Sequence, residues 1–303
     1  RHSPGGYRDA SRSASSLQAG ADPDRDLDAE LAVLVERAVD AIRAGGARPD
    51  AVFGAFAELN SFVRAVTYHE GKLLEWGLER LVADNPALVL MPRETALPIV
   101  PAALELLERN DWGSLEGLRL RSEVHYKTTY IPDIFAVDRD RHSALLLDVK
   151  RSLASYPERK LNALRKRMMA AALIAGDWLH LEGRVPGVSK IDIAIIDGSN
   201  AERDHARGIF ALDEIGELIE VAFAGDAMMQ LRAKFAQRIQ QEIQQVCRRA
   251  LRGGRDEDRT ARGLAADPIV SGVAAEPEDA TDAEDGELSD EAIRFDGFTA
   301  GGA

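Results

Sequence analysis

The sequence predicts an α/β protein with a mixed central sheet flanked by helices, preceded by N-terminal helices and followed by a long C-terminal helix. Apolar residues recur at helical spacing through residues 26–86, which is typical of amphipathic helices. Short runs rich in Val, Ile and Leu appear between residues 118 and 198, and a helical pattern separates two of them. Strands that alternate with helices pack as a sheet with helices on its faces, so this alternation gives the class.

The first part of the chain is expected to be mainly helical. Residues 26–46 have a helical pattern that stops at a Gly pair, and residues 49–66 follow with a Pro-Asp start signal. A third helix is predicted from residue 68 and ends before Pro86. "ALVLM", residues 87–91, predicts a short strand, and "PAALELLERN", residues 101–110, predicts another helix.

The pattern of apolar residues along the chain changes after residue 117. Residues 118–138 alternate and predict one or two strands, and residues 144–150, "ALLLDVK", predict a strand inside the sheet. A helix is predicted over residues 156–179 and a further interior strand over residues 190–198. Residues 227–251 predict a long polar helix. Its apolar stripe is suited to docking on the domain or to a short helix–helix dimer: Met229, Leu231, Phe235, Ile239, Ile243 and Val246.

Composition divides the chain into five segments. The last one, from residue 252, accounts for −9 of the net charge of −13, which leaves −4 for the rest of the chain. A strongly acidic segment with little to bury is expected to be disordered. The expected segments are a disordered N-terminal segment (1–26), a helical N-terminal region (27–67), the core (68–225), the long helix (226–251) and an acidic disordered tail (252–303).

The sequence also limits the cellular setting. No run of eighteen apolar residues occurs, so no membrane partner is expected. The chain has one cysteine, Cys247, which excludes an internal disulfide and a multi-cysteine zinc site. We therefore expect a cytoplasmic protein in a reducing compartment.

Residues 130–152, "YIPDIFAVDRDRHSALLLDVKRS", place charged residues inside apolar runs. Residues two apart in a strand share a face, so Asp148 and Lys150 should point the same way, with Asp133 beside them on the neighbouring strand of a hairpin. Two carboxylates at a strand end, together with the backbone carbonyl of Val149, form a hard-oxygen site suited to Mg²⁺ or Mn²⁺. A lysine beside such a metal holds a water and stabilises phosphate oxygens, which is the chemistry of metal-assisted phosphodiester hydrolysis.

Pro132-Asp133 followed by Asp148-Val149-Lys150 resembles the signature of the PD-(D/E)XK nuclease superfamily. The resemblance covers residues 68–198 and extends to the order of elements: an acidic helix, strands that bear the motif, a helix and a further strand. It implies a restriction-endonuclease-like core and a metal-dependent deoxyribonuclease. It does not single out a family within the superfamily.

The resemblance also implies a glutamate from the helix before the sheet. The segment from Gly71 to Glu75, "GKLLE", is similar to the pattern of a small residue, two apolar residues and Glu found there, so Glu75 is the favoured auxiliary metal ligand and catalytic residue. Glu70 and Glu79 lie on the same predicted helix and remain alternatives. The plain alternative for all three is a solvated helix face.

Basic residues crowd the region after the motif, where they would neutralise phosphates and follow a nucleic-acid backbone. Tyr130 is a candidate for stacking on a base, with packing in the sheet as the alternative. The expected nucleic-acid-binding residues are Arg151, Arg159, Lys160, Arg165, Lys166, Arg167 and Tyr130.

The leading hypothesis is a Mg²⁺-dependent (or Mn²⁺-dependent) nuclease that acts on DNA in repair, restriction or mobile-element processing. Asp133 and Asp148 hold the metal, Lys150 orients water, and Glu75 assists. The alternative hypothesis is a non-cleaving subunit that binds nucleic acid or scaffolds proteins on the same fold, with the charged trio as plain ion pairs. A homodimer or a protein partner through the N-terminal or C-terminal helices is compatible with both hypotheses.

Overall fold

The computed structural model describes residues 26–264, apart from residues 116, 123, 124, 127, 155 and 184, and its side chains are described up to residue 252. The chain divides into two compact units, Arg1–Arg259 and Thr260–Ala303, and all of the described strands belong to the first. Residues 1–25 of the N-terminal segment and residues 265–303 of the acidic tail, where the sequence predicts disorder, lie outside the described residues.

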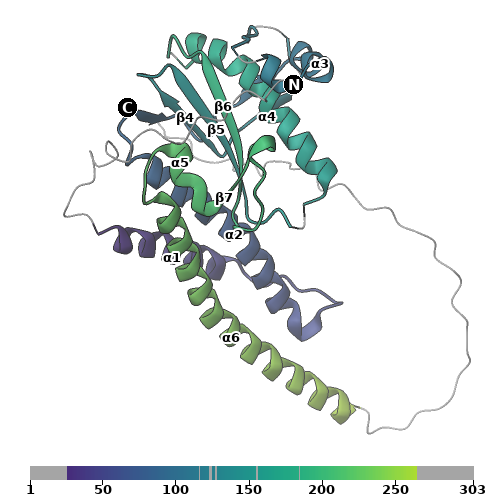
Figure 1. Cartoon of the computed structure of the whole chain (residues 1–303). Helices are drawn as coiled ribbons and strands as arrows, with labels where there is room; N and C mark the ends of the chain where they lie inside the picture. The colour runs from purple at the N-terminus through teal and green to yellow at the C-terminus, as the bar shows by residue number, and fades with distance from the viewer. Residues whose placement is uncertain are drawn as a thin grey trace, which may run out of the picture. The chain divides into compact units, whose positions relative to one another are not determined.

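A five-stranded mixed sheet forms the centre of the fold, as the sequence predicts (Figure 1). The strand order is β1-β4-β5-β6-β7. Strand β4 is antiparallel to both of its neighbours, whereas β5, β6 and β7 run parallel. The strands are β1 (Leu88–Leu90), β4 (Ile134–Asp138), β5 (Ser143–Lys150), β6 (Lys190–Asp197) and β7 (Ile209–Ala211).

Strands β4 and β5 form the hairpin that the sequence predicts. The pairing runs from Asp138 opposite Ser143 to Ile134 opposite Leu147. One further step of this register brings Asp133 opposite Asp148. Strand β5 is almost wholly buried, because it lies in the middle of the sheet with layers on both faces.

One face of the sheet is covered by four helices. They are α1 (Leu27–Ala44), α2 (Ala57–Val82), the short α5 (Ile215–Ile219) and the long α6 (Ala224–Leu264). Their apolar residues form one core cluster with Leu145, Leu147 and Val149 of β5. A 3₁₀ turn, η1 (Gly54–Phe56), leads directly into α2.

The other face is covered by α4 (Glu158–Leu181), α3 (Pro101–Arg109) and a small antiparallel sheet. This small sheet pairs β2 (Leu97–Ile99) with β3 (Thr128–Tyr130). The buried middle of α4 packs here against Ala144 and Leu146 of β5. Because side chains alternate along a strand, Asp148 and Lys150 belong to this second face. Three short 3₁₀ turns complete the described part: η2 (Trp112–Leu115), η3 (His205–Arg207) and η4 (Leu212–Glu214).

Two boundaries predicted from the sequence are wrong. The two helices predicted over residues 49–66 and 68–85 are one continuous helix, α2, because no Gly or Pro interrupts the chain between them. Helix α6 continues to Leu264, so the segment assigned to the acidic tail begins too early. The Gly pair at 253–254 does not end the helix, and opposite charges at i,i+4 spacing follow it in the sequence.

Three short elements were not predicted: β2, β7 and α5. Each has only three to five residues, which is too short for a periodic pattern. Residues 118–122, which were included in a predicted strand region, form no strand. Residues 128–138 do form the two strands expected there, β3 and β4.

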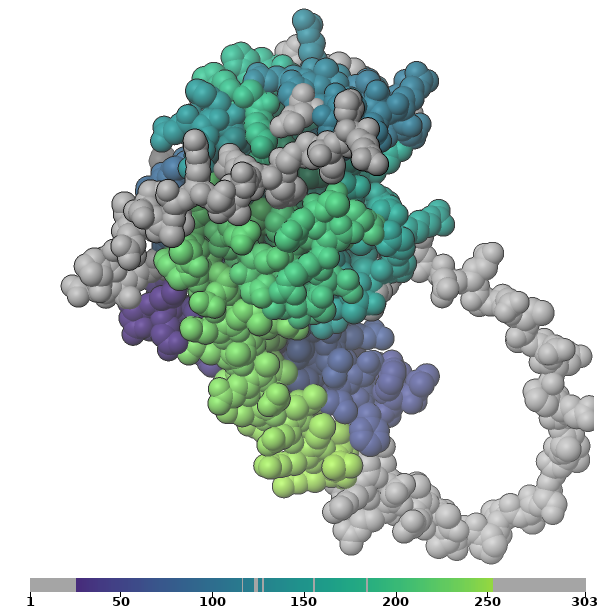
Figure 2. Space-filling view, in the orientation of Figure 1, coloured from purple at the N-terminus to yellow at the C-terminus, as the bar shows by residue number. Residues whose placement is uncertain are grey.

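Helix α6 docks on the domain through both apolar and ionic contacts. Its Met228, Leu231 and Phe235 are buried in the core cluster shared with α1 and α2. Glu242 of α6 accepts from Arg43 of α1 at 2.7 Å, and further ion pairs join the two helices. Figure 2 shows the surface of α6 adjoining that of α1 and of the first part of α2. Across the described residues, no helix is long and apolar enough to cross a membrane.

Candidate functional site

Asp133 and Asp148 converge at the end of the β4–β5 hairpin. Asp133 immediately precedes β4, and its Oδ2 accepts a hydrogen bond of 2.7 Å from the backbone N–H of Val149. This N–H lies beyond the last β4–β5 pair, so the carboxylate continues the hairpin where the backbone pairing stops. Asp148 is 4% exposed and lies on the face turned towards α4. The two carboxylates therefore share one end of the sheet.

Lys150 lies between the two carboxylates. Its Nζ forms an ion pair with Asp148 Oδ1 and lies 4.0 Å from Asp133 Oδ2. Tyr130 of β3 donates a hydrogen bond of 3.1 Å from its hydroxyl to Asp148 Oδ2. The stacking role predicted for Tyr130 is wrong in this structure, because the side chain is only 3% exposed. Tyr130 instead holds Asp148 in place.

Helix α2 brings Glu75 and Lys72 to the same site. Lys72 Nζ contacts both carboxylate oxygens of Glu75, at 3.0 and 2.9 Å. Glu75 and Lys72 both interact electrostatically with Asp133, so this pair lies on the Asp133 side of the site. The other two candidate glutamates have different partners: Glu70 contacts Arg151 and Arg232, and Glu79 contacts Arg93. Of the three, Glu75 is the one whose charge acts on Asp133.

Burial and like charge both act on the site. Burial, the neighbouring Asp148 and Glu75 together raise the pKa of Asp133 to about 7, against the lowering effect of Lys150 and the Val149 N–H. Burial alone would lower the pKa of Lys150, but Asp148 and Asp133 outweigh it and raise that pKa. Burial, followed by the nearby carboxylates, raises the pKa of Tyr130. The Tyr130 hydroxyl thus stays protonated and can donate to Asp148.

Asp197 is a residue that the sequence reasoning missed. It ends β6 in register with Lys150, and the N–H of Gly198 donates to the Lys150 carbonyl at 2.7 Å. The Asp197 side chain is fully buried. Its carboxylate accepts from the backbone of Leu153, Ser199, Ala201 and Glu202 and from the Ser199 hydroxyl. A polar residue at the end of the apolar run "KIDIAIID" was the available signal.

The residues present suit a divalent cation in their chemistry. Carboxylate oxygens are the ligands that Mg²⁺ and Mn²⁺ prefer. Within the part of the chain that the structure describes, Asp148 Oδ1 is buried, meets no hydrogen-bond donor of suitable geometry and forms an ion pair with Lys150. Among the described residues, no three His, Cys, Asp or Glu side chains are grouped as a ready-made metal cluster. Glu75 contacts Lys72 in this structure, so Asp133 and Asp148 are the two carboxylates that converge on Lys150.

The predicted basic residues divide into two groups. Arg151 lies at the site and contacts Glu70 at 3.5 Å. The others belong to α4, where Arg159 and Lys160 are exposed in the first turn. Further along α4, Lys166 pairs with Glu108 and Arg167 donates to the Thr129 carbonyl. Arg165 is partly buried, and its Nε has no hydrogen-bond partner in the part of the chain described. Lys166 and Arg167 therefore already have partners within the protein, which the sequence does not indicate.

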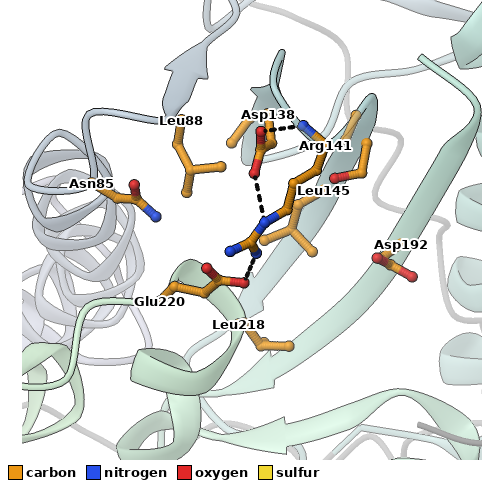
Figure 3. Close-up of a pocket in the computed structure, with 11 residues that line it drawn as sticks. Asn85, Leu88, Asp138, Arg141, Leu145, Asp192, Leu218 and Glu220 are labelled. Atoms are coloured by element: carbon orange, nitrogen blue, oxygen red, sulfur yellow. Dashed lines mark hydrogen bonds and ion pairs between the residues drawn. The ribbon is translucent and has the colours of Figure 1, made fainter. Parts of the chain in front are cut away.

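A small pocket lies at the opposite end of the sheet (Figure 3). It measures about 50 Å³ and is bordered by Asp138, Arg141 and Glu220, which are joined by ion pairs. Ser143, at the start of β5, lines it, whereas Lys150 ends the same strand about 23 Å away at the usual rise per residue. The pocket is therefore separate from the aspartate site.

Neither family models, curated proteins nor solved structures give a match to this chain. The case for a function therefore rests on the geometry of the site.

Proposed function

We propose that the chain is a Mg²⁺-dependent nuclease that hydrolyses DNA phosphodiester bonds, with Mn²⁺ as an alternative cofactor. The observation that carries the proposal is the convergence of Asp133 and Asp148 on Lys150 at the carboxyl end of β5. The order of elements supports a restriction-endonuclease-like core, since α2, the motif-bearing strands, α4 and β6 follow one another as the PD-(D/E)XK resemblance implies. DNA repair, restriction and mobile-element processing are settings in which such an activity is used.

The residues have distinct roles in this proposal. Asp133 and Asp148 hold the cation, Glu75 assists, and the Val149 carbonyl is a further oxygen donor beside them. A divalent cation held there supplies Lewis acidity towards a phosphate oxygen and a water. Lys150 presents its ammonium group to the negative charge that develops on the phosphate in the transition state. Tyr130 keeps the Asp148 carboxylate oriented through its hydroxyl.

The test is cleavage of plasmid and single-stranded DNA with Mg²⁺ or Mn²⁺. Asp148→Asn and Lys150→Ala should each reduce the rate by at least about 100-fold, the scale of losing a preorganised charge at a reaction centre. The matched control is Asp192→Asn, because Asp192 is an exposed Asp of β6 that pairs with Lys190. Activity that survives both site substitutions would remove the proposed active site.

The non-cleaving alternative draws on one observation: Lys150 already contacts both carboxylates, so the trio is also a self-contained ion-pair network. Calorimetric titration of Mg²⁺ and Mn²⁺ separates the two functions. A nuclease should bind the cation at a site abolished by Asp133→Asn, whereas a non-cleaving subunit should show no such site.

A further inference from the structure

Glu70 joins two arginines that come from distant parts of the chain. Its Oε2 lies 3.5 Å from Nη1 of Arg151, the residue directly after β5, and its Oε1 accepts from Nε of Arg232 of α6 at 3.1 Å. Helix α2 supplies the carboxylate, so three separate elements meet there. Two guanidinium groups directed at one anionic group form an arrangement that also binds phosphate.

The two arginines keep donors free for a ligand. The Glu70 side chain is 13% exposed, whereas the side chains of Arg151 and Arg232 are 41% and 29% exposed. A guanidinium group has five N–H donors. In the described part of the chain, the side-chain hydrogen bonds of each of these arginines come from a single nitrogen and go to Glu70. The remaining donors are on groups that solvent reaches.

The arginine pair lies next to the proposed active site. Arg151 directly follows Lys150, so their Cα atoms are about 3.8 Å apart, and strand alternation turns Arg151 towards α2 and α6. Glu75 reaches the site from the same helix as Glu70, five residues or about 7.5 Å further along it. Lys150 faces α4 and Arg151 faces α2, so a DNA strand that crosses this end of the sheet with one phosphate at Lys150 would carry a neighbouring phosphate towards the arginine pair.

We propose that Arg151 and Arg232 bind a backbone phosphate of the substrate strand flanking the cleaved bond, and that Glu70 occupies this phosphate site in the free protein. The identity of the ligand rests on the proposed nuclease function. The Glu70 carboxylate then competes with the substrate, so it lowers affinity instead of only stabilising the fold. An ordinary structural ion pair makes the opposite prediction, since its loss brings no gain in binding.

The test is binding of a labelled single-stranded DNA oligonucleotide in EDTA, measured by fluorescence anisotropy, so that no cleavage is involved. Glu70→Gln keeps the size of the side chain and should tighten binding by about three- to tenfold at low salt. Arg151→Gln and Arg232→Gln should weaken binding by a similar factor, and each should reduce the salt slope by about 1. Adding Arg232→Gln to Glu70→Gln should abolish the gain.

The same two helices provide a matched control. Glu58 of α2 pairs with Arg249 of α6 at 2.6 Å, about 25 Å along α2 from Glu75. Glu58→Gln changes the net charge as Glu70→Gln does, but it should leave affinity unchanged. Equal tightening by both variants would reduce the effect to general charge and overturn the proposal. Unchanged or weaker binding by folded Glu70→Gln would overturn it as well.

Failure of the proposed function gives a different result. If the wild-type chain binds no DNA, the ligand class is wrong, and calorimetric titration with inorganic pyrophosphate then tests the arginine pair directly. Glu70→Gln should bind pyrophosphate more tightly than the wild type, and Arg232→Gln should bind it less tightly. Equal affinities would mean that the pair is no anion site.

Discussion

A single buried carboxylate, that of Asp197, ties together the segments around the candidate site. It joins the end of β6 to the turn after β5 through Leu153 and to its own following turn through Ser199, Ala201 and Glu202. Burial alone would raise the pKa of Asp197, but these hydrogen bonds outweigh burial and lower it. The ionised carboxylate therefore stabilises the fold.

We expect Asp197→Asn to lower the free energy of unfolding at pH 7 by about 2–4 kcal/mol, because a neutral amide cannot accept the same set of bonds. The pKa is lower in the folded state than in the unfolded state, where it is about 3.9. The contribution of Asp197 to stability is thus complete above about pH 5. It is lost as the pH falls below the unfolded-state pKa and through the lower folded-state pKa. Urea unfolding at pH 7, 5, 4 and 3 measures the difference between wild type and variant, which should shrink as the solution becomes more acidic.

Asp192→Asn is the control for this pH dependence, because Asp192 is exposed and lies in the same strand. It should change stability by less than about 0.5 kcal/mol at any of these pH values. A constant difference between wild type and Asp197→Asn across the range would show that the charge of Asp197 is not the cause.

The residues of the site differ in how far the sequence could predict them. The shared face of Asp148 and Lys150 and the position of Asp133 opposite them follow from strand periodicity and a short hairpin, and the structure has both features. The contact of Tyr130 with Asp148 depends on how the small β2–β3 sheet packs over the main sheet. The Lys72–Glu75 pair and the Asp197 network likewise depend on tertiary packing, which has no local period in the sequence.

Helix α2 also has some features that follow from local periodicity and others that depend on tertiary packing. Its existence follows from apolar periodicity, but its length was misjudged as two helices. Its packing is set by Gly77, where an added Cβ would lie 2.4 Å from Leu231 Cδ2 and 2.9 Å from Met228 Sδ of α6. Both neighbours are fully buried side chains, so they can yield only by repacking against the core around them. Gly71, on the same helix, has no atom within 4 Å of an added Cβ.

These two glycines give opposite predictions for the same substitution. Gly71→Ala should raise the free energy of unfolding by about 0.5–1 kcal/mol, since alanine favours the helix and meets nothing. Gly77→Ala should lower it by about 1–3 kcal/mol, because crowding of α6 exceeds the gain in helix propensity. Chemical denaturation of the two variants measures both changes. Stabilisation by Gly77→Ala would contradict the close approach of α2 and α6.

At the scale of the whole molecule, α6 docks on the domain. Its sequence alone is compatible both with docking and with a helix–helix dimer. Five of its apolar residues, including Met228, Leu231 and Phe235, are buried in the cluster with α1 and α2, and its Glu242 is buried between Arg43 and Arg238. The docked helix also carries Arg232 to the candidate site. The helix is therefore part of the folded domain and supports the site from the side of α2.

Truncation tests this role. A chain that ends at residue 223 lacks the burial of Met228, Leu231 and Phe235, each worth about 1.5–3 kcal/mol, which together are comparable to the whole stability of a typical domain. We expect it to lose cooperative thermal unfolding when followed by circular dichroism. A chain that ends at residue 252 keeps every described contact of α6 and should unfold within about 2 °C of the full chain. If α6 served only to join two copies, the shorter chain would instead remain folded and change only its mass in solution, so light scattering on both truncations distinguishes the two roles.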